Sequence, residues 1–519
     1  MHGYFRRFVV ALSCNEEFVQ QEREKNMTST TTMEKPVEAP SSFYPSLVAL
    51  EDAVRRDLEI LDYPSKRWMR PQERPDGAHV HDVIVIGGGH CGLTAAFALM
   101  RERIANILVL DENPVGYEGP WQTYARMPDL RTRKAVTGME LGFSNLTFRA
   151  YYEAREGLAA YGELKRISCD EWTGYLIWLR RVLSLPVQNE SRVEKITPDG
   201  NIFRLDVVHG DRRQTLLARR IVLAWGPLAM GGPYVPDIIR NGLPSTAWRH
   251  VYDNFESETF KGKRLIVIGA GASAFDNAGT ALEIGAAEVN LLVRRPHIPR
   301  LSLIRATDTA GFLGTYADLD DQQRIALMSE VQRNPSPPTI RSLNRVEKWP
   351  NFHIHFSAPL VSARMEGAEV VVQTQQGEVR GDEVLLATGF AFSLQKCAPI
   401  EGFAGQIACW GDRYSAADGV VPERYRNVPY LGRNYQFTEK TPGAAPFLKH
   451  IYDFNQSATL SMGPTGRVSG LKYGVRRLMQ GVAGSFMQED FTRQLALIRD
   501  YNDSELDGHP WVEKPTVAK

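Results

Sequence analysis

The sequence predicts an α/β protein with two Rossmann-like dinucleotide-binding domains, each carrying an antiparallel β ribbon. The stretches "VIVIGGGHCGLTAAFALM" (83–100) and "RLIVIGAGASAFDNAGTALEIG" (264–285) both run from an apolar strand through a glycine turn into a helix of small residues. Each stretch is followed by a strand, turn, strand, strand pattern, at 192–224 and at 364–389. Two copies of one plan therefore make up most of the chain.

The rest of the chain is expected to surround these two copies. We expect a short helix in "YPSLVALEDAVRRDLEIL" and a helical insertion closed by "NPSPP". The expected segments are a disordered tail (1–45), an accessory helix (46–80), the first nucleotide-binding domain (81–245), the second with a helical insertion at 301–345 (246–395), a return to the first domain with a substrate-pocket loop at 437–455 (396–485), and a C-terminal extension (486–519).

Composition favours a cytoplasmic protein that acts on a small molecule. Lys plus Arg and Asp plus Glu both number 61 in 519 residues, so the overall charge attracts neither nucleic acid nor an anionic membrane. The five cysteines include no C-x-x-C pair, which argues against a zinc site, a dithiol centre or a disulfide framework. The N-terminal apolar run, 8–12, is too short for a signal peptide, and Met27 is an alternative start.

The first glycine turn has the form G-x-G-x-x-G, with Gly87, Gly89 and Gly92. These glycines allow the tight turn, the approach of a pyrophosphate and close packing of helix on strand. Asp111 closes the next strand 22 residues after Gly89, where a carboxylate accepts hydrogen bonds from ribose hydroxyls. The spacing predicts a dinucleotide site.

The second turn has the form G-x-G-x-x-A, with Gly269, Gly271 and Ala274. Arg294 and Arg295 follow its second strand, where an NAD site would carry an acid, and two guanidinium groups suit the 2′-phosphate of NADPH. One acidic and one basic site predict two different nucleotides, FAD in the first and NADPH in the second, with a hydride passing between them.

The sequence resembles the class B flavoprotein monooxygenases. The motifs "GGGHCG", "GYEGPW", "GAGASA" and "LLATGF" fall in that family's order, and "DEVLLATGF" is similar to the motif of its N-hydroxylating branch. The segment "PSTAWRHVYDNF" keeps the His of the fingerprint shared by the other branches, His250, but has Pro244, Thr246 and Asn254 at neighbouring motif positions.

The resemblance implies that NADPH reduces FAD, that oxygen adds at the flavin C4a position, and that the resulting (hydro)peroxide oxygenates a small organic substrate. It implies cofactor contacts for Trp121, Thr388 and Gly389, and a final helix, opened by Gly470, whose positive end points at the flavin. Arg294 or Arg295 would also supply a cation to the peroxide, and His250 is a further catalytic candidate. No metal is expected.

Other functions stay open at the level of sequence. A flavin reductase that passes electrons to a quinone or a protein, and a non-catalytic redox sensor, both fit two nucleotide sites. The substrate could be an amine, a ketone, a sulfide or an oxidised heterocycle such as a purine, because specificity loops carry no motif here. Self-association into a homo-oligomer also stays open.

Overall fold

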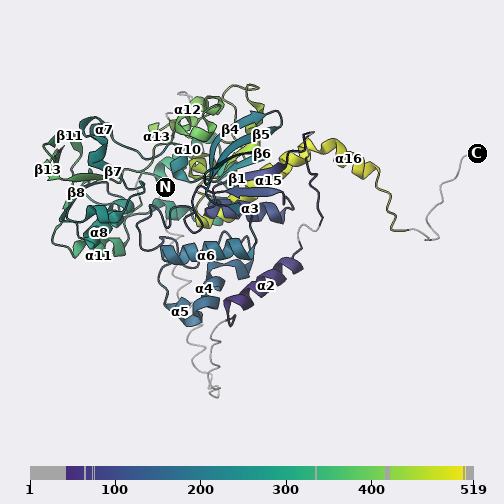
Figure 1. Ribbon diagram of the computed structural model, residues 1–519, viewed down its shortest axis with the longest axis horizontal. Helices are drawn as coiled ribbons and strands as arrows, with labels where there is room; N and C mark the ends of the chain where they lie inside the picture. Colours follow the sequence, from purple (N-terminus) through teal and green to yellow (C-terminus); the bar gives the residue numbers. More distant parts are fainter. Residues whose placement is uncertain are drawn as a thin grey trace, which may run out of the picture. The chain divides into compact units, whose positions relative to one another are not determined.

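A seven-stranded sheet of the computed structural model contains the first glycine turn (Figure 1). Its central strand β1 pairs in parallel with β2 and β6, and β15 pairs in parallel with β6. Its elements are β1 (Val80–Ile86), β2 (Ile107–Leu110), β3 (Val187–Gln188), β4 (Ser191–Asp199), β5 (Ile202–His209), β6 (Arg212–Leu223) and β15 (Ile451–Asp453), with α3 (His90–Arg101) after β1. The carboxyl ends of β2, β1, β6 and β15 therefore share one edge, the edge at which the glycine turn lies.

The structure describes residues 43–62, 66–72, 74, 76–333, 336–414, 421–506 and 509. Nearly all of the predicted tail 1–45, with Met27, lies outside the described residues. No helix within these ranges is both long enough and apolar enough to cross a membrane.

A second, fully parallel sheet contains the second glycine turn. Its order is β10-β9-β8-β14-β7, and its central strands are buried on both faces, one of which packs on a helix and the other on a separate three-stranded sheet. Its elements are β7 (Trp248–His250), β8 (Arg264–Ile268), β9 (Glu288–Leu292), β10 (Phe352–His355) and β14 (Glu383–Leu386), with α8 (Ala272–Ile284) after β8 and α7 (Asp237–Gly242) before β7. The prediction of two Rossmann-like units is confirmed.

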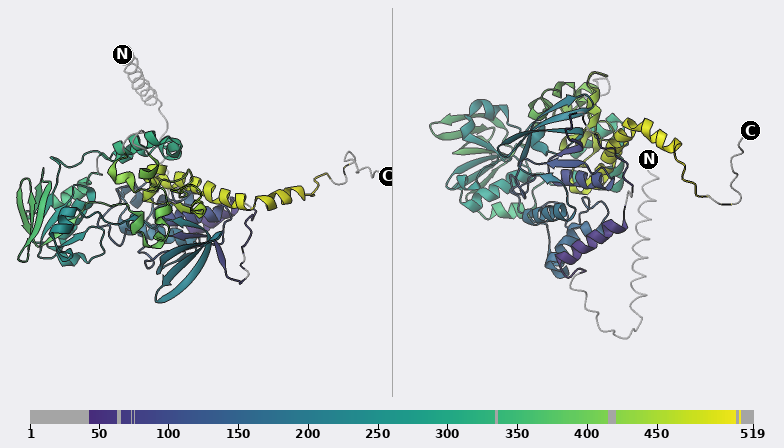
Figure 2. Two further views of the ribbon diagram at one scale, coloured as in Figure 1. Left: turned by 90° about the horizontal axis from the view of Figure 1, so that it is seen from above. Right: turned by 45° about the vertical axis from the view of Figure 1, so that its right-hand side comes forward.

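Both predicted antiparallel ribbons are present, and they differ in how they join their units (Figure 2). The first ribbon, β4–β6, belongs to the first sheet because β6 pairs antiparallel with β5 and parallel with β1. The second ribbon is a separate three-stranded sheet of β11 (Leu360–Glu366), β12 (Glu369–Thr374) and β13 (Gly377–Gly381). In the first unit the last ribbon strand, β6, itself pairs with β1, the strand before the glycine turn. In the second unit the last ribbon strand, β13, leads to β14, which pairs with β8, the strand before the glycine turn.

Four helices that lie together in Figure 1 form an aromatic-rich layer on the first unit. They are α2 (Leu47–Ile60), α4 (Phe148–Glu156), α5 (Leu158–Glu163) and α6 (Cys169–Val182). Trp172, Tyr175 and Trp178 of α6 pack against Phe148 and Tyr151 of α4. Within the predicted accessory helix 46–80, α2 ends at Ile60, and the described residues between Ile60 and β1 form no further helix.

The predicted insertion 301–345 is helical but does not form one lobe. It contains α9 (Ala310–Thr315), α10 (Asp321–Val331) and α11 (Ile340–Glu347). Tyr316, Ile325 and Met328 form a hydrophobic cluster with Trp410, Tyr425 and Leu460, beside α12 (Trp410–Arg413), α13 (Glu423–Arg426) and α14 (Thr459–Met462). By contrast, α11 packs on α8, so it covers the second sheet. The insertion therefore divides between two cores.

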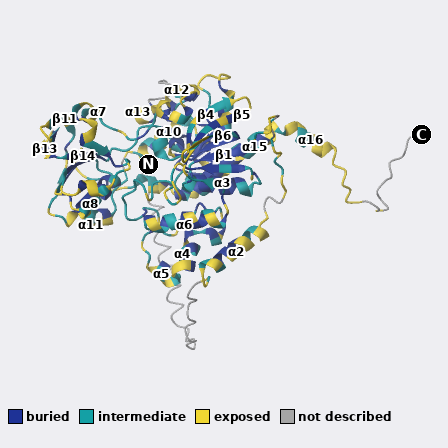
Figure 3. Cartoon of the chain, viewed as in Figure 1, coloured by how far each residue is buried: buried dark blue, intermediate teal, exposed yellow. Residues whose placement is uncertain are grey.

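The C-terminal helices differ in burial (Figure 3). The long helix α15 (Val468–Glu489) packs on α3 and buries one face, which includes Leu471, Val475 and Leu478. The following helix α16 (Phe491–Arg499) buries no residue. The predicted C-terminal extension, 486–519, begins inside α15, which ends at Glu489. Its first residue, Phe486, is buried in the core of the first unit.

Candidate active site

The first glycine turn requires glycine at two of its three predicted positions. Gly87 has a φ of +106°, and a Cβ there would lie 2.3 Å from the carbonyl oxygen of Ala224. A Cβ at Gly92 would lie 1.8 Å from the carbonyl oxygen of Gly87. At Gly89 the nearest atom to a Cβ would be Gly119 Cα, 3.8 Å away. The turn is closed against β6 and leaves space at Gly89, where the pyrophosphate is expected.

Asp111 directly follows β2, and its carboxylate accepts a hydrogen bond from the backbone of this turn. Its Oδ2 accepts a hydrogen bond from Gly88 N at 2.7 Å, and its Oδ1 accepts one from Asn113 N at 2.9 Å. Burial raises the pKa of Asp111, and these backbone donors oppose that rise. Asn113 Nδ2 also donates to Oδ1, at 3.2 Å, so Oδ2, which accepts from Gly88 alone, is the oxygen with a lone pair left for the predicted ribose contact.

Buried donors without acceptors gather beside the first turn. The Trp121 ring lies 5.9 Å from that of His90, the first residue of α3, and Trp225 follows β6 by two residues. The indole Nε1 atoms of Trp121 and Trp225 are buried with no hydrogen-bond partner among the described residues. Buried polar atoms are nearly always paired in native proteins. FAD offers ring carbonyls, ribityl hydroxyls and phosphates as acceptors, so this edge fits the predicted cofactor.

Three helices that begin at the site lack a capping side chain. They are α3, α8 and α15, whose N-cap residues are Gly89, Gly271 and Arg467. By contrast, α2, α4, α6, α9, α10 and α11 each begin after a Ser, Thr or Asp whose side chain accepts a first-turn N–H. The uncapped first turns keep N–H groups for anionic ligands, which the helix dipole also favours.

Gly470 has a packing role at the start of α15. The helix begins at Val468, two residues before the predicted opening residue. A Cβ at Gly470 would lie 2.6 Å from Thr465 Cα, so glycine lets the helix approach the preceding segment. His90 Nε2 and Cys91 Sγ of α3 both contact the carbonyl oxygen of Gly466, at 3.0 and 3.5 Å. The N-terminal ends of α3 and α15 therefore meet.

The second glycine turn has more free space at its middle glycine than the first. Gly269 has a φ of +151°, and a Cβ there would lie 2.6 Å from the carbonyl oxygen of Ala387. No atom lies within 4 Å of a Cβ placed on Gly271. Ala274 is fully buried where α8 packs on the sheet. This turn faces a cavity, and its glycines Gly269 and Gly271 line it.

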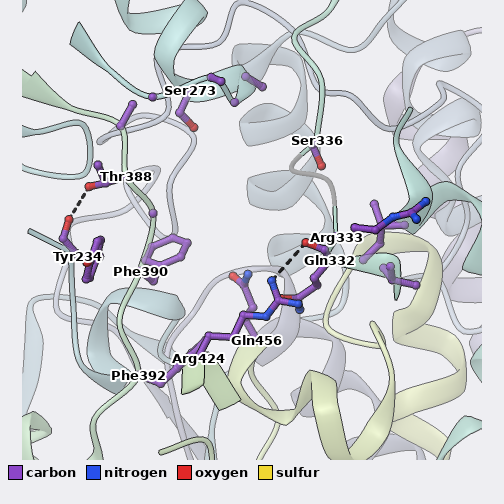
Figure 4. Close-up of a pocket in the computed structure, with 18 of the residues that line it drawn as sticks. Tyr234, Ser273, Gln332, Arg333, Ser336, Thr388, Phe390, Phe392, Arg424 and Gln456 are labelled. Atoms are coloured by element: carbon purple, nitrogen blue, oxygen red, sulfur yellow. Dashed lines mark hydrogen bonds between the residues drawn. The ribbon is translucent and has the colours of Figure 1, made fainter. Parts of the chain in front are cut away.

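The cavity has a volume of about 1130 Å³ and is lined by the second unit, by the helical cluster around Tyr425 and by the segment before α15. Thr388, which follows β14, lies on one side of the cavity with Tyr234 and Phe390, and Arg333 and Gln332 lie on the other (Figure 4). Gly389 and Arg424 also line the cavity. The Thr388 hydroxyl donates to the carbonyl of Tyr234, and Arg424 donates to that of Gln332 at 3.2 Å.

The charge of the cavity is one-sided. Six arginines line it, and no Asp or Glu does among the residues described. These arginines are Arg131, Arg294, Arg295, Arg333, Arg424 and Arg467. An acid-free lining of this kind favours phosphates and other anions.

Arg294 and Arg295 follow β9 and line the cavity, as a site for a 2′-phosphate requires. Arg294 is exposed, and no carboxylate of the described residues lies within ion-pair distance of it. Arg295 donates to the carbonyl of Arg333 at 3.2 Å. The structure thus brings the two predicted arginines and the second glycine turn to one cavity.

The other four arginines were missed at the level of sequence, because they come from four separate segments without a motif. Arg131 pairs with Asp276 of α8 at 3.1 Å, and the Ser342 hydroxyl donates to the other Asp276 oxygen at 2.5 Å. Burial lowers the pKa of both Arg131 and Arg467. Arg467 also has a carboxylate neighbour, Asp308, at 3.8 Å. An anionic ligand in the cavity would further stabilise the charged forms of these two partly desolvated arginines.

His250 does not line the cavity, so its predicted catalytic role has no support in this geometry. It ends β7 and is fully buried. Its Nε2 lies 3.4 Å from the Thr388 hydroxyl, and its Nδ1 faces the backbone N–H of Tyr252 at 3.3 Å. Burial lowers its pKa to about 4, which keeps the ring neutral. His250 supports the loop that carries Thr388.

None of the residues of the predicted substrate-pocket loop 437–455 lines this cavity, so the cavity gives that prediction no support. The lining begins one residue later with Gln456 and continues to Arg467. The irregular 437–455 segment is partly buried, with Phe437, Leu448 and Phe454 in the core of the first unit, whereas residues 440–444 are exposed. In the described part of the chain, no cluster of His, Cys, Asp or Glu could hold a metal ion.

Comparison with known proteins gives one relative along nearly the whole chain. The pyridine nucleotide-disulphide oxidoreductase family matches residues 84–304. The FAD-dependent urate hydroxylase of Xanthomonas campestris pv. campestris is 38% identical over 476 residues, which cover 91% of this chain and 99% of the relative. All four cysteines within the described residues are free thiols.

Solved structures share the fold at low identity. Ornithine hydroxylase PvdA of Pseudomonas aeruginosa matches with a TM-score of 0.61 and 17% identity, over 79% of this chain and 99% of that chain. Ornithine N-hydroxylase KtzI of Kutzneria sp. 744 matches with a TM-score of 0.59 and 16% identity, over 78% of this chain and 99% of that chain.

Proposed function

Because this chain belongs to the family of FAD-dependent hydroxylases that includes the Xanthomonas urate hydroxylase, we propose that it hydroxylates urate or a closely related oxidised purine, with NADPH and O2 as co-substrates. The observation that carries the choice of substrate is the lining of the cavity, which has four arginines besides Arg294 and Arg295 and no described carboxylate. Urate is a planar anion at neutral pH, and guanidinium groups bind planar oxyanions through paired hydrogen bonds.

The same observation argues against the amine substrates of the structural neighbours. A cationic amine is usually held by a carboxylate, and none of the described residues that line this cavity is acidic. A reductase that works through cysteine thiols has less support, because desolvation raises the pKa values of the Cys91 and Cys397 thiols to about 12.

We assign the binding roles as follows. FAD, when bound at the first turn, supplies electron transfer from NADPH to O2 and delivery of one oxygen atom to the substrate. The uncapped helices α3 and α8 bind the phosphates of FAD and NADPH, and Arg294 and Arg295 bind the NADPH 2′-phosphate. The Tyr252 and Phe390 rings, stacked 4.3 Å apart at the cavity wall, exclude water from the centre.

We also propose a cytoplasmic location. The described cysteines are free and no cysteine pair has redox spacing, which suits a reducing compartment that supplies NADPH.

The test is a two-step measurement on purified holoenzyme. We expect fast anaerobic reduction of the flavin by NADPH, slow reduction by NADH, and loss of one urate per NADPH after oxygen is added. Incorporation of one ¹⁸O atom from ¹⁸O2 into the product identifies oxygenation. Reduction followed only by hydrogen peroxide release with urate, or hydroxylation of ornithine or lysine instead of urate, would refute this substrate.

A further inference from the structure

Asp453 is a buried carboxyl group with no role in the binding scheme above. It ends β15 at the carboxyl edge of the first sheet and is fully buried. Its Oδ2 accepts a hydrogen bond from the Ser457 hydroxyl at 2.5 Å. Its Oδ1 is buried and has no hydrogen-bond partner among the described residues. A buried carboxyl is costly unless it is paired or has a function that requires it.

The groups that face Asp453 do not compensate its charge. They are the thiol of Cys91 on α3, the thiol of Cys397 and the phenol of Tyr435. Burial raises the pKa of both thiols to about 12 and raises that of Tyr435 as well, so all three are neutral at physiological pH. No Lys or Arg of the described chain forms an ion pair with Asp453. Burial therefore raises the pKa of Asp453 to about 7.

Ser457 connects this carboxyl group to the cavity. It lies in the short turn Gln456–Ala458 and lines the cavity together with Gln456, while Asp453 does not line it. Ser457 is 1% exposed, and its hydroxyl donates its proton to Asp453, so its oxygen can still accept a hydrogen bond from a donor that reaches it. Asp453 can therefore act on a ligand only through Ser457.

We propose that Ser457 and Asp453 form a proton relay that takes an N–H proton from the substrate as it is hydroxylated. This inference rests on the proposed function. The substrate proton passes to Ser457 Oγ while the Ser457 hydroxyl proton passes to Asp453 Oδ2, which becomes a carboxylic acid. The electron pair of the broken N–H bond stays on the ring as the new C–O bond forms.

The overall reaction balances. One O2, one NADPH and one proton give the hydroxylated product, one water and NADP⁺, and the proton held on Asp453 leaves with that water. Ser457 contacts the substrate, whereas Asp453 is a positioning residue that acts through Ser457.

The experiment compares S457A with S461A in the FAD-loaded protein. Ser461 is a matched control, because it is a buried serine on the same segment that bonds Trp410 and the Pro429 carbonyl and does not line the cavity. For S457A we expect unchanged flavin content, unchanged anaerobic reduction by NADPH, and a fall in urate hydroxylation of about 100-fold. We also expect the acid limb near pH 7 in the wild-type rate profile to disappear.

D453N gives a second readout that does not depend on turnover. Infrared difference spectra of the holoenzyme between pH 6 and 8 are expected to show a buried carboxylic acid band that D453N abolishes. Wild-type hydroxylation and an unchanged acid limb in S457A would overturn the relay, as would loss of flavin in D453N with S457A like wild type. A wild-type enzyme that reduces its flavin but never hydroxylates urate would refute the proposed function instead, whatever the variants do.

Discussion

The two glycine turns have nearly the same sequence pattern and opposite surroundings. At the first turn, Asp111 accepts from Gly88, the aromatic residues beside it are partly buried, and α15 contacts α3. At the second turn, Gly271 faces open space and the exposed Arg294 lines a large cavity. One turn is enclosed by the protein and the other is open.

This difference matches the two nucleotides assigned to the turns. A cofactor that stays bound through every turnover gains from an enclosed site, because burial slows its release. A co-substrate that must enter and leave each cycle needs an open site with exposed charges that attract it. The same glycine motif can thus bind a nucleotide that stays on the protein or one that exchanges in each cycle, and the elements that surround the motif decide which.

The largest effect is expected from Gly92→Ala in the enclosed turn. The new Cβ would meet the Gly87 carbonyl at 1.8 Å, so the turn must shift, and we expect a loss of roughly 3 kcal/mol in stability and of most bound flavin. Flavin absorbance per protein and the urea midpoint check this. Gly162→Ala, with no atom within 4 Å, is the matched control and should keep its flavin.

The next largest effect is expected at the open turn, from replacing Arg294 and Arg295 together by alanine. Loss of the 2′-phosphate contacts should lower kcat/KM for NADPH by about 100-fold and leave that for NADH within about threefold. Steady-state kinetics with both nucleotides measure this, and Arg300→Ala, outside the cavity lining, is the control. Equal losses with both nucleotides would contradict the assignment.

Gly271→Ala should separate ligand binding from folding. Nothing in the protein lies within 4 Å of the new Cβ, so the melting temperature should stay the same. The methyl group would crowd the pyrophosphate, and we expect the KM for NADPH to rise about tenfold while flavin content is unchanged. A fall in stability like that of Gly92→Ala would show that the two turns do not differ as described.

A smaller effect is expected from acid on His250, which supports the loop of the open turn. Its folded-state pKa is about 4 against 6.5 unfolded, so its contribution to stability is full above pH 6.5 and is lost as the pH falls toward 4. At pH 5.5 the protein has lost about 1.4 kcal/mol of this contribution to its free energy of unfolding. Urea unfolding of wild type and His250→Gln at pH 7.5 and 5.5 should show a smaller pH dependence in the variant. Equal dependence would contradict the burial of a neutral ring.

The sequence by itself predicted the two units, their ribbons and their cofactors. Periodicity and glycine spacing are local, and a strand, a turn and a helix within about 30 residues define each nucleotide-binding motif. Gly87, Gly92, Gly269, Arg294 and Arg295 could be assigned for this reason, since each acts beside its own chain neighbours.

Only the tertiary structure decided which residues share the cavity. Arg131, Arg424 and Arg467 lie on three segments far apart in sequence. Ser457 and Asp453 are only four residues apart, but the cavity that Ser457 lines is completed by segments distant from both. The structure also places His250 and the 437–455 segment outside the lining of the cavity, which depends on how distant segments pack. Contacts between distant segments follow from packing, and packing leaves no pattern in the local sequence.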